Sequence, residues 1–183
     1  HLDRICFGAG CFWGTEKFFK EDFVKSNPSV HLYNGRVGYM GPLQAVGNPS
    51  YREVCSGRTG HVEVYDVEYS GGGEVLKKLC RHFFSFHDPT TLNRQGTDVG
   101  TQYASMIYCY QKDQIEIAKE IKNEYQRLSE NKVVRYSDNT ILTDILDATT
   151  FYPAEEEHQA YLKKNPGGYC NHFYRIDTAR LPH

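Results

Sequence analysis

The 183-residue sequence lacks the features that mark several large classes of protein. No apolar run approaches the roughly 20 residues that a membrane-spanning helix needs, and no signal-like segment opens the chain. Positive and negative side chains nearly cancel, with 21 Lys and Arg against 23 Asp and Glu. A charge so balanced offers no basic surface for nucleic acid or anionic lipid. We therefore expect neither nucleic acid nor a membrane as a partner.

Cysteine is present, but without the spacing of a metal site or of a disulfide framework. No Cys-x-x-Cys pair and no matching His-x-x-x-His occurs among the six cysteines, which are Cys6, Cys11, Cys55, Cys80, Cys109 and Cys170. Structural zinc sites use such spacings, so we expect no metal. The chain is long enough to fold without disulfides, and its cysteines lie inside apolar runs. This usage fits a reducing compartment, and we expect a cytoplasmic protein, or a mitochondrial one if a transit peptide was removed.

Length and composition fit one domain covering residues 1–183. Apolar residues make up 39% of the chain and aromatic residues 14%, which is enough to build a hydrophobic core. There is no internal repeat, low-complexity run or interdomain linker. We expect a single catalytic domain that is monomeric.

Hydrophobic periodicity predicts an α+β fold. Apolar spacing indicates strands and helices in the order β-α-β-β-α-β, with strands at 4–8, 31–39, 61–69 and 104–110, one helix at 12–24 and another after the glycines at 71–73. That order is typical of the split βαβ or ferredoxin-like unit. It predicts a two-layer sandwich whose antiparallel or mixed sheet carries helices on one face.

Further elements are expected after this unit. The pattern predicts a helix at 113–128, a short edge strand at 133–136, and a last helix at 154–163 opened by Pro153. A short helical turn is also expected at 51–55. After Pro166 a long irregular tail should run through Cys170 to His183.

One cysteine stands where a strand hands over to a helix. Gly10-Cys11-Phe12-Trp13-Gly14 follows an apolar run and precedes an amphipathic one, so Cys11 should lie at the first turn of the helix. Unpaired N–H groups and the helix dipole favour an anion there and can lower the pKa of a thiol. We expect a nucleophilic thiolate. The alternative is that Cys11 is a small core residue, as many free cysteines are.

A second candidate is an acidic residue in the middle of a strand. Glu63 shares a strand face with His61 and Tyr65. A carboxyl group in such an aromatic, partly desolvated place has a raised pKa and can act as an acid. The alternative is a solvated strand residue paired with Arg58 or a lysine.

Several motifs resemble the methionine sulfoxide reductase A family. Gly10-Cys11-Phe12-Trp13-Gly14 closely resembles its active-site motif, and the Gly-His-x-Glu stretch at 60–63 resembles the segment whose glutamate donates a proton to the sulfoxide. The other matches are Gly38-Tyr39 for the first active-site tyrosine, residues 95–103 for the loop that supplies Asp98 and Tyr103, and Gly168-Tyr169-Cys170 for the resolving-cysteine segment.

The resemblance implies an enzyme that reduces methionine-S-sulfoxide, free or in proteins, to methionine. Cys11 would attack the sulfoxide sulfur and become a sulfenic acid, which Cys170 would resolve as a disulfide before reduction by thioredoxin. The residues that would help are Glu63, Tyr39 and Tyr103 as donors to the oxygen, Asp98 as a support acting through water, and Phe12, Trp13 and Tyr169 as substrate contacts. No metal or organic cofactor is implied.

Two other functions remain open on sequence. Cys11, His61 and Asp98 could form an acyl-transfer triad. Alternatively, Phe12, Trp13, Tyr39 and Tyr103 could form an aromatic cage for methylated ammonium groups. A separate question is whether Cys55 is a reserve resolving thiol or a small residue packed beneath its loop.

Overall fold

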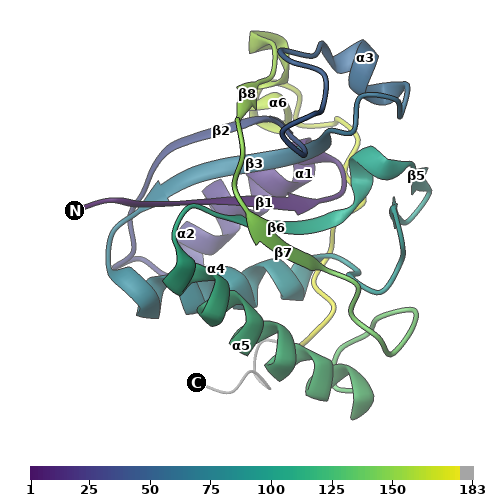
Figure 1. Ribbon diagram of the computed structural model, residues 1–183. Coiled ribbons are helices and arrows are strands. Elements are labelled where there is room, and N and C mark those ends of the chain that lie inside the picture. Colours follow the sequence, from purple (N-terminus) through teal and green to yellow (C-terminus); the bar gives the residue numbers. More distant parts are fainter. Residues whose placement is uncertain (178–183) are drawn as a thin grey trace.

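A six-stranded mixed sheet forms the centre of the protein in a computed structural model, which describes residues 1–177 (Figure 1). Across the sheet the strands are β7 (Asp144–Asp147), β6 (Ser105–Cys109), β1 (Asp3–Ala9), β3 (Val62–Tyr69), β2 (Leu32–Met40) and β8 (Tyr152–Pro153). Every neighbouring pair is antiparallel except β6 and β7. A small separate hairpin joins β4 (Arg94–Gln95) to β5 (Asp98–Val99).

The predicted α+β class is confirmed, and the four inner strands lie where the periodicity placed them. The strands β7 and β8 extend the sheet at its two edges beyond the expected four-stranded unit. The ferredoxin-like description therefore stays a prediction for the inner strands alone.

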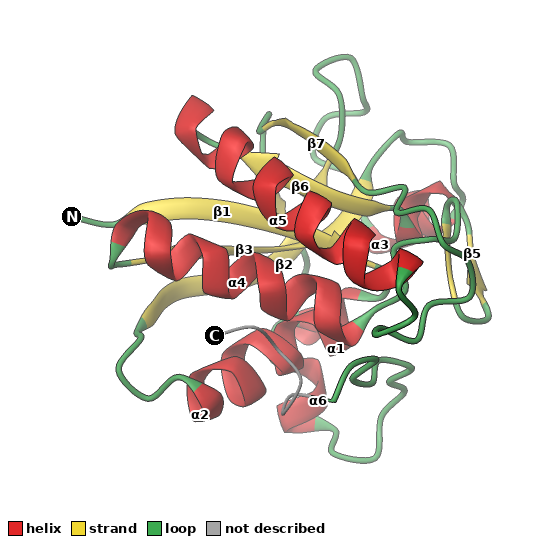
Figure 2. Ribbon diagram, turned by 90° about the horizontal axis from the view of Figure 1, so that it is seen from below, coloured by secondary structure: helices red, strands yellow, loops and turns green. Residues whose placement is uncertain are grey.

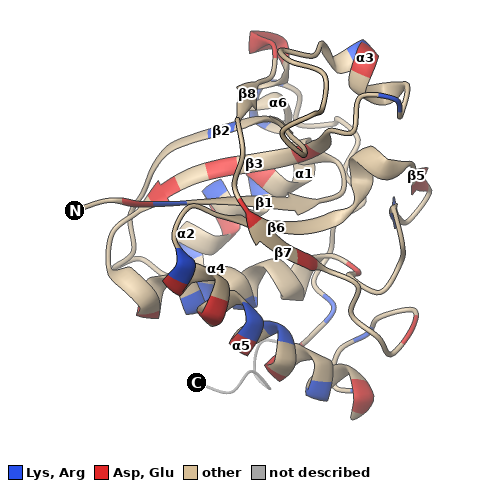
Figure 3. Ribbon diagram, in the orientation of Figure 1, with Lys and Arg blue, Asp and Glu red and all other residues tan. Residues whose placement is uncertain are grey.

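The helices cover one face of the sheet (Figure 2). The first is continuous from Phe12 to Ser26 and comprises α1 (Phe12–Lys17), a wider π-helical section η1 (Phe18–Phe23) and α2 (Val24–Ser26). Beside it lie α4 (Gly72–Phe86) and α5 (Lys112–Glu130). Charged side chains of both signs lie on α4 and α5 (Figure 3), and Arg81 pairs with Glu124 between these two helices at 2.9 Å.

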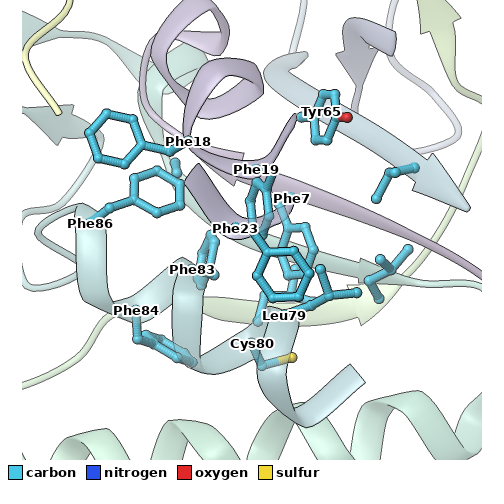
Figure 4. Close-up of a cluster of buried hydrophobic side chains, with 14 of the residues drawn as sticks. Phe7, Phe18, Phe19, Phe23, Tyr65, Leu79, Cys80, Phe83, Phe84 and Phe86 are labelled. Carbon is cyan, nitrogen blue, oxygen red and sulfur yellow. The ribbon is translucent and has the colours of Figure 1, made fainter. Parts of the chain in front are cut away.

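Aromatic side chains join the helix layer to the sheet (Figure 4). Phe7 of β1 stacks on Phe19 with ring centroids 4.7 Å apart and on Phe83 of α4 at 5.2 Å. All three side chains are fully buried. Burying one such ring stabilises a fold by about 1.5–3 kcal/mol, so this cluster fixes η1 and α4 against the sheet.

A smaller cluster covers the other face of the sheet. It contains Cys6, Met40, Val64 and Met106 among its buried members, with Phe151 packed against it. The connection between β7 and β8 crosses this face in Figure 1. The inner strands are thus buried on both sides.

Two predicted elements are wrong. No strand forms at 133–136, because the backbone N–H of Arg135 donates to Arg175 of the tail while β7 takes the place at the sheet edge. The helix predicted at 154–163 is instead a 3₁₀ turn η3 (Glu156–His158) and a short α6 (Tyr161–Lys164), with Pro153 in β8. Side chains break the helix, since Gln159 bonds both backbone groups of Val37.

The segment after α6 is irregular as predicted, but it is anchored to the body of the protein. His172 is buried with its Nε2 atom 2.6 Å from the carbonyl of Ala9. The backbone N–H of Arg175 donates to the carbonyl of Ser85 at 2.8 Å. The final predicted stretch, residues 178–183, lies outside the described residues. Among the residues that are described, no helix has the length and apolarity to cross a membrane.

Candidate active site

Antiparallel pairing gathers the predicted site residues at one end of the sheet, where neighbouring strands begin and end. Ala9, at the end of β1, pairs with Ser105 at the start of β6. Tyr39, near the end of β2, pairs with Glu63 near the start of β3. Residues separated by up to 96 positions in the sequence, as Ala9 and Ser105 are, therefore lie near Cys11, which is two residues beyond the end of β1.

The turn into α1 requires glycine. Gly10 has φ +89°, and a Cβ atom there would lie 2.7 Å from the side chain of Gln95. Cys11 is the residue that caps the N-terminus of α1, and its carbonyl accepts hydrogen bonds from the backbone and the hydroxyl of Thr15. The tight turn places the thiol at the helix end, as the sequence predicts.

The expected lowering of the Cys11 pKa is wrong. The side chain is only 7% exposed, and burial raises the pKa of its thiol well above the usual value. The carboxyl group of Glu63 acts in the same direction, while the N–H groups of Trp13 and Gly14 oppose it. Desolvation outweighs the helix terminus here, because the charged thiolate loses its water. Cys11 rests as a protonated thiol.

Glu63 is a buried acid beside this thiol. It is 1% exposed, and its Oε1 atom accepts the backbone N–H of Phe12 at 3.2 Å. Burial raises the pKa of Glu63 to about 8, with the charge of Asp98 acting in the same direction. Its Oε2 atom and the hydroxyl of Tyr39 are buried and have no hydrogen-bond partner among the described residues. Buried polar atoms are nearly always paired, so this pair marks a place for a polar ligand.

Aromatic rings line the same site. The ring of Phe12 is fully buried and lies 5.7 Å from that of Tyr39 and 6.1 Å from that of Tyr51. Trp13 is half-buried and stacks on Tyr161 at 3.8 Å. The predicted pair of Phe12 and Trp13 is thus part of a larger aromatic wall.

Sequence reasoning missed three members of this wall, which are Tyr51, His158 and Tyr161. Tyr51 begins the short helix α3 (Tyr51–Cys55), whose position was predicted but whose direction was not. His158 and Tyr161 were placed on a regular helix that does not form. The signal in the sequence is an aromatic-rich segment beside three glutamates, which a helical pattern also explains.

Asp98 lies beside the segment that carries Cys170. The phenol of Tyr169 lies near Asp98 and Thr97, and the side-chain amide of Asn171 donates to a carboxylate oxygen of Asp98 at 3.4 Å. The residue after Cys170 is therefore tied to the loop of Asp98, and the residue before it lies beside that loop. Tyr103 is half-buried, and burial and then the charges of Glu63 and Asp98 raise its pKa.

Cys170 itself is exposed and lies against the first turn of α1. A Cβ atom on Gly14 would stand 3.1 Å from the sulfur of Cys170 and 2.0 Å from Nδ1 of His172. Only glycine allows the tail to approach so closely. Position 14 is one helical turn from Cys11, so the two predicted redox cysteines lie in one region of the protein.

Comparison with known proteins shows the family of the chain. The model of the family described as peptide methionine sulfoxide reductase matches residues 3–181. The chain belongs to this family. Peptide methionine sulfoxide reductase MsrA of Vibrio parahaemolyticus is 44% identical over 171 residues, which are 93% of this chain and 74% of the relative.

Solved structures agree with this assignment. Mxr1 from Saccharomyces cerevisiae in reduced form has a TM-score of 0.81 and 37% identity, covering 95% of this chain and 92% of that one. Mxr1 in complex with Trx2 has a TM-score of 0.57 and 24% identity, with coverage of 95% and 90%, and supports the fold alone. This peptide methionine sulfoxide reductase is thus an oxidoreductase that reduces methionine sulfoxide by thiol chemistry.

The remaining cysteines of this peptide methionine sulfoxide reductase differ in exposure. Cys6, Cys80 and Cys109 are buried in the two clusters. Cys55 is exposed, so it is not packed beneath its loop. Its use as a reserve thiol stays a prediction.

The acyl-transfer triad does not form in this family member. The Nε2 atom of His61 bonds the carbonyl of Val46, and its ring meets that of Tyr152 edge to face at 5.6 Å. In a triad the two imidazole nitrogens would bond Cys11 and Asp98, whereas Nε2 of His61 bonds a backbone carbonyl.

One cluster in the described part of the chain offers the atoms of a metal site. Glu155, Glu157 and His158 bring three possible ligand atoms within 4.8 Å of one another. His158 also accepts the indole N–H of Trp13 at 3.1 Å, which ties this cluster to the aromatic wall.

Proposed function

We propose that this enzyme reduces the S epimer of methionine sulfoxide, both free and in proteins, with Cys11 as nucleophile and Cys170 as resolving thiol. One observation carries the proposal. The unpartnered oxygens of Glu63 and Tyr39 are buried beside the Cys11 thiol within an aromatic wall. A methyl sulfoxide has the matching chemistry, with one strongly accepting oxygen and one apolar methyl group on a soft sulfur.

Binding would divide the substrate between these two surfaces. The methyl group would lie against Phe12 and Trp13, whose rings supply apolar contact area. The oxygen would accept hydrogen bonds from protonated Glu63 and from the hydroxyls of Tyr39 and Tyr103. These donors are fixed before the substrate arrives, so they stabilise charge on the oxygen without reorganising.

The first chemical step can proceed without a proton from solvent. Glu63 donates its proton to the sulfoxide oxygen, which makes the sulfur more electrophilic, and the sulfur of Cys11 attacks it. The thiol proton of Cys11 passes to the carboxylate of Glu63 and restores the acid. The oxygen leaves on Cys11 as a sulfenic acid, and methionine is released. Cys11 is oxidised by the two electrons that the substrate sulfur gains.

The second step would join the two cysteines. The thiol of Cys170 attacks the sulfenic sulfur of Cys11, so that a disulfide forms and water leaves. The hydrogen bond from Asn171 to Asp98, with Tyr169 beside the same carboxylate, would hold Cys170 in this region. We propose a direct anchoring role for Asp98, in place of the water-mediated support that the resemblance implies.

Thioredoxin would complete the cycle through thiol-disulfide exchange. Its dithiol would attack the exposed sulfur of Cys170, leaving two thiols on the enzyme and a disulfide on thioredoxin. Mxr1, whose reduced form is 37% identical to this chain, also has a solved structure in complex with Trx2, and this supports thioredoxin as the partner. We further propose that residues 1–183 form one monomeric catalytic domain, and that it works in the cytoplasm, because all six of its cysteines are free.

A coupled assay tests the proposed function. A peptide carrying the S-sulfoxide, with thioredoxin, thioredoxin reductase and NADPH, should give steady methionine formation with the wild-type protein. The R epimer of the same peptide is the matched control and should remain unreduced. The Cys11→Ser variant should form no methionine at all. Equal turnover of both epimers, or turnover by Cys11→Ser, would contradict the proposal.

A further inference from the structure

His158 occupies an unexpected place at the base of the aromatic wall. It is 7% exposed, and its ring lies 4.2 Å from that of Tyr51 and 5.7 Å from that of Phe12. Its Nδ1 atom is 3.1 Å from the indole Nε1 of Trp13. On its other side, Nε2 is 3.4 Å from a carboxylate oxygen of Glu155.

These contacts fix which ring nitrogen of His158 carries the proton. The indole nitrogen of Trp13 can only donate, so Nδ1 of His158 must accept and cannot hold a hydrogen. In the neutral ring the proton is then on Nε2, the nitrogen that lies 3.4 Å from the carboxylate of Glu155. The tautomer is assigned from this pattern of hydrogen bonds.

Glu155 is itself held in position. Its second carboxylate oxygen accepts the backbone N–H of Tyr51 at 3.1 Å. The neighbouring Glu157 differs, because its carboxylate is 77% exposed and stands 3.9 Å from Nε2 of His158, beyond hydrogen-bond length. A chain of contacts thus runs from α3 through Glu155 and His158 to the indole of Trp13.

We propose that His158 is a positioning residue for sulfoxide reduction, which holds the indole of Trp13 in place as one wall of the methyl pocket while Glu155 keeps its ring in the accepting tautomer. The inference rests on the proposed function, which places the substrate methyl group against Phe12 and Trp13. It adds two residues that act on the substrate through Trp13 and touch no reacting atom.

The same tautomer argues against a metal in this cluster. A divalent cation would need the lone pair of Nε2, where the proton now stands, and Nδ1 is occupied by the indole N–H. Binding a metal would therefore displace the Nε2 proton beside the carboxylate of Glu155. The hydrogen bonds of His158 with Trp13 and of Glu155 with Tyr51 account for these two members of the cluster, and Glu157 lies beyond hydrogen-bond length of His158.

The experiment uses two variants of His158 that separate stacking from hydrogen bonding. His158→Phe keeps a ring against Tyr51 but removes the acceptor, whereas His158→Asn loses the ring but keeps an acceptor near the position of Nδ1. Glu155→Gln weakens the tautomer lock because its acceptor is no longer charged. Glu157→Gln is the matched control. Circular dichroism and thermal melts first establish that each variant is folded.

Two readouts are measured on reduced protein. Trp13 is the only tryptophan, so the decay of its fluorescence anisotropy reports the mobility of this one indole. The second readout is the rate of the first turnover, without reductant, as a function of S-sulfoxide concentration. Because the methyl pocket holds substrate and transition state alike, its loss should raise the half-saturating concentration and leave the maximal rate little changed.

The proposal expects His158→Phe to free the indole and to raise the half-saturating concentration about tenfold, the value of one lost hydrogen bond of about 1.4 kcal/mol. His158→Asn should stay close to wild type in both readouts, Glu155→Gln should lie between, and Glu157→Gln should match wild type. An indole in His158→Phe as rigid as in wild type would overturn the proposal, as would equal losses in the Phe and Asn variants. The anisotropy result holds even if wild type forms no methionine, in which case the proposed function alone fails.

Discussion

The buried acid Glu63 gives a sharp prediction about pH. Its pKa of about 8 means that the carboxyl group is protonated at neutral pH and ionises as the pH rises through 8. The thiol of Cys11 keeps its proton across the same range, because its pKa lies far higher. The proposed first step needs Glu63 as a proton donor. The rate should therefore be level below about pH 7 and fall at alkaline pH.

The size of the effect follows from the titration. Above pH 8 the protonated fraction of Glu63 falls about tenfold for each pH unit, and the first-turnover rate should follow it. Replacing the acid by Glu63→Gln keeps an acceptor for the N–H of Phe12 but removes the proton. General acid catalysis is worth about 100-fold or more, so the variant should be slower by at least that factor. Its remaining rate should show no fall near pH 8.

The assay is rapid mixing of reduced enzyme with a subsaturating S-sulfoxide peptide, quenched and analysed for methionine at pH 6 to 10. Subsaturating substrate reports the ionisation of the free enzyme. A wild-type rate that rises through pH 8 would refute the reasoning. It would mean that the reactive state has lost one proton and that Cys11 attacks as a thiolate.

Four further predictions concern the neighbours of this pair. Cys170→Ser should release about one methionine per chain but lose steady turnover with thioredoxin, and a sulfenic-acid reagent should label Cys11; steady turnover would exclude Cys170 as the resolving thiol. Gly14→Ala should lower the free energy of unfolding by about 1–3 kcal/mol and slow disulfide formation, because its Cβ would meet His172. Gly167→Ala is the control and should change neither quantity, because open space surrounds Gly167. Asp98→Asn should move the alkaline limb of the rate to lower pH by removing a charge that raises the pKa of Glu63, and an unmoved limb would remove that coupling. Folding raises the pKa of Glu63 from 4.5 to about 8, so the folded state holds a proton that the unfolded state releases, and stability is lost as the pH rises between these values. In urea denaturation at pH 7, Glu63→Gln should therefore be more stable than wild type by up to about 3 kcal/mol. Equal stability of the two proteins at pH 7 would argue against a raised pKa.

The inner elements were predictable because their patterns are local. The apolar stripe of α4 follows from one buried face, so sequence periodicity located this helix closely. The predictions for 133–136 and 154–163 were wrong because contacts with residues far away in the sequence determine the backbone conformation there. The backbone N–H of Arg135 donates to the carbonyl of Arg175 in the tail. Ala160 has φ +51°, which interrupts a helix, and its backbone N–H donates to Glu16 at 2.8 Å.

The candidate site divides in the same way. The motif around Cys11 and the family resemblance predicted residues that meet at one end of the sheet, including Glu63 and Tyr39. The protonation state of Cys11 could not be predicted, because the degree of burial at a helix end depends on the whole fold. His158 was missed for a related reason, since its role depends on a contact with Trp13 across 145 residues.

The stoichiometry of a single turnover tests the central claim most directly. Reduced protein is mixed with excess S-sulfoxide peptide without any reductant, after which methionine is counted and the remaining thiols are mapped by alkylation and mass spectrometry. The account predicts about one methionine per chain, a fall from six thiols to four, and a crosslink between Cys11 and Cys170. No methionine and six intact thiols would contradict it.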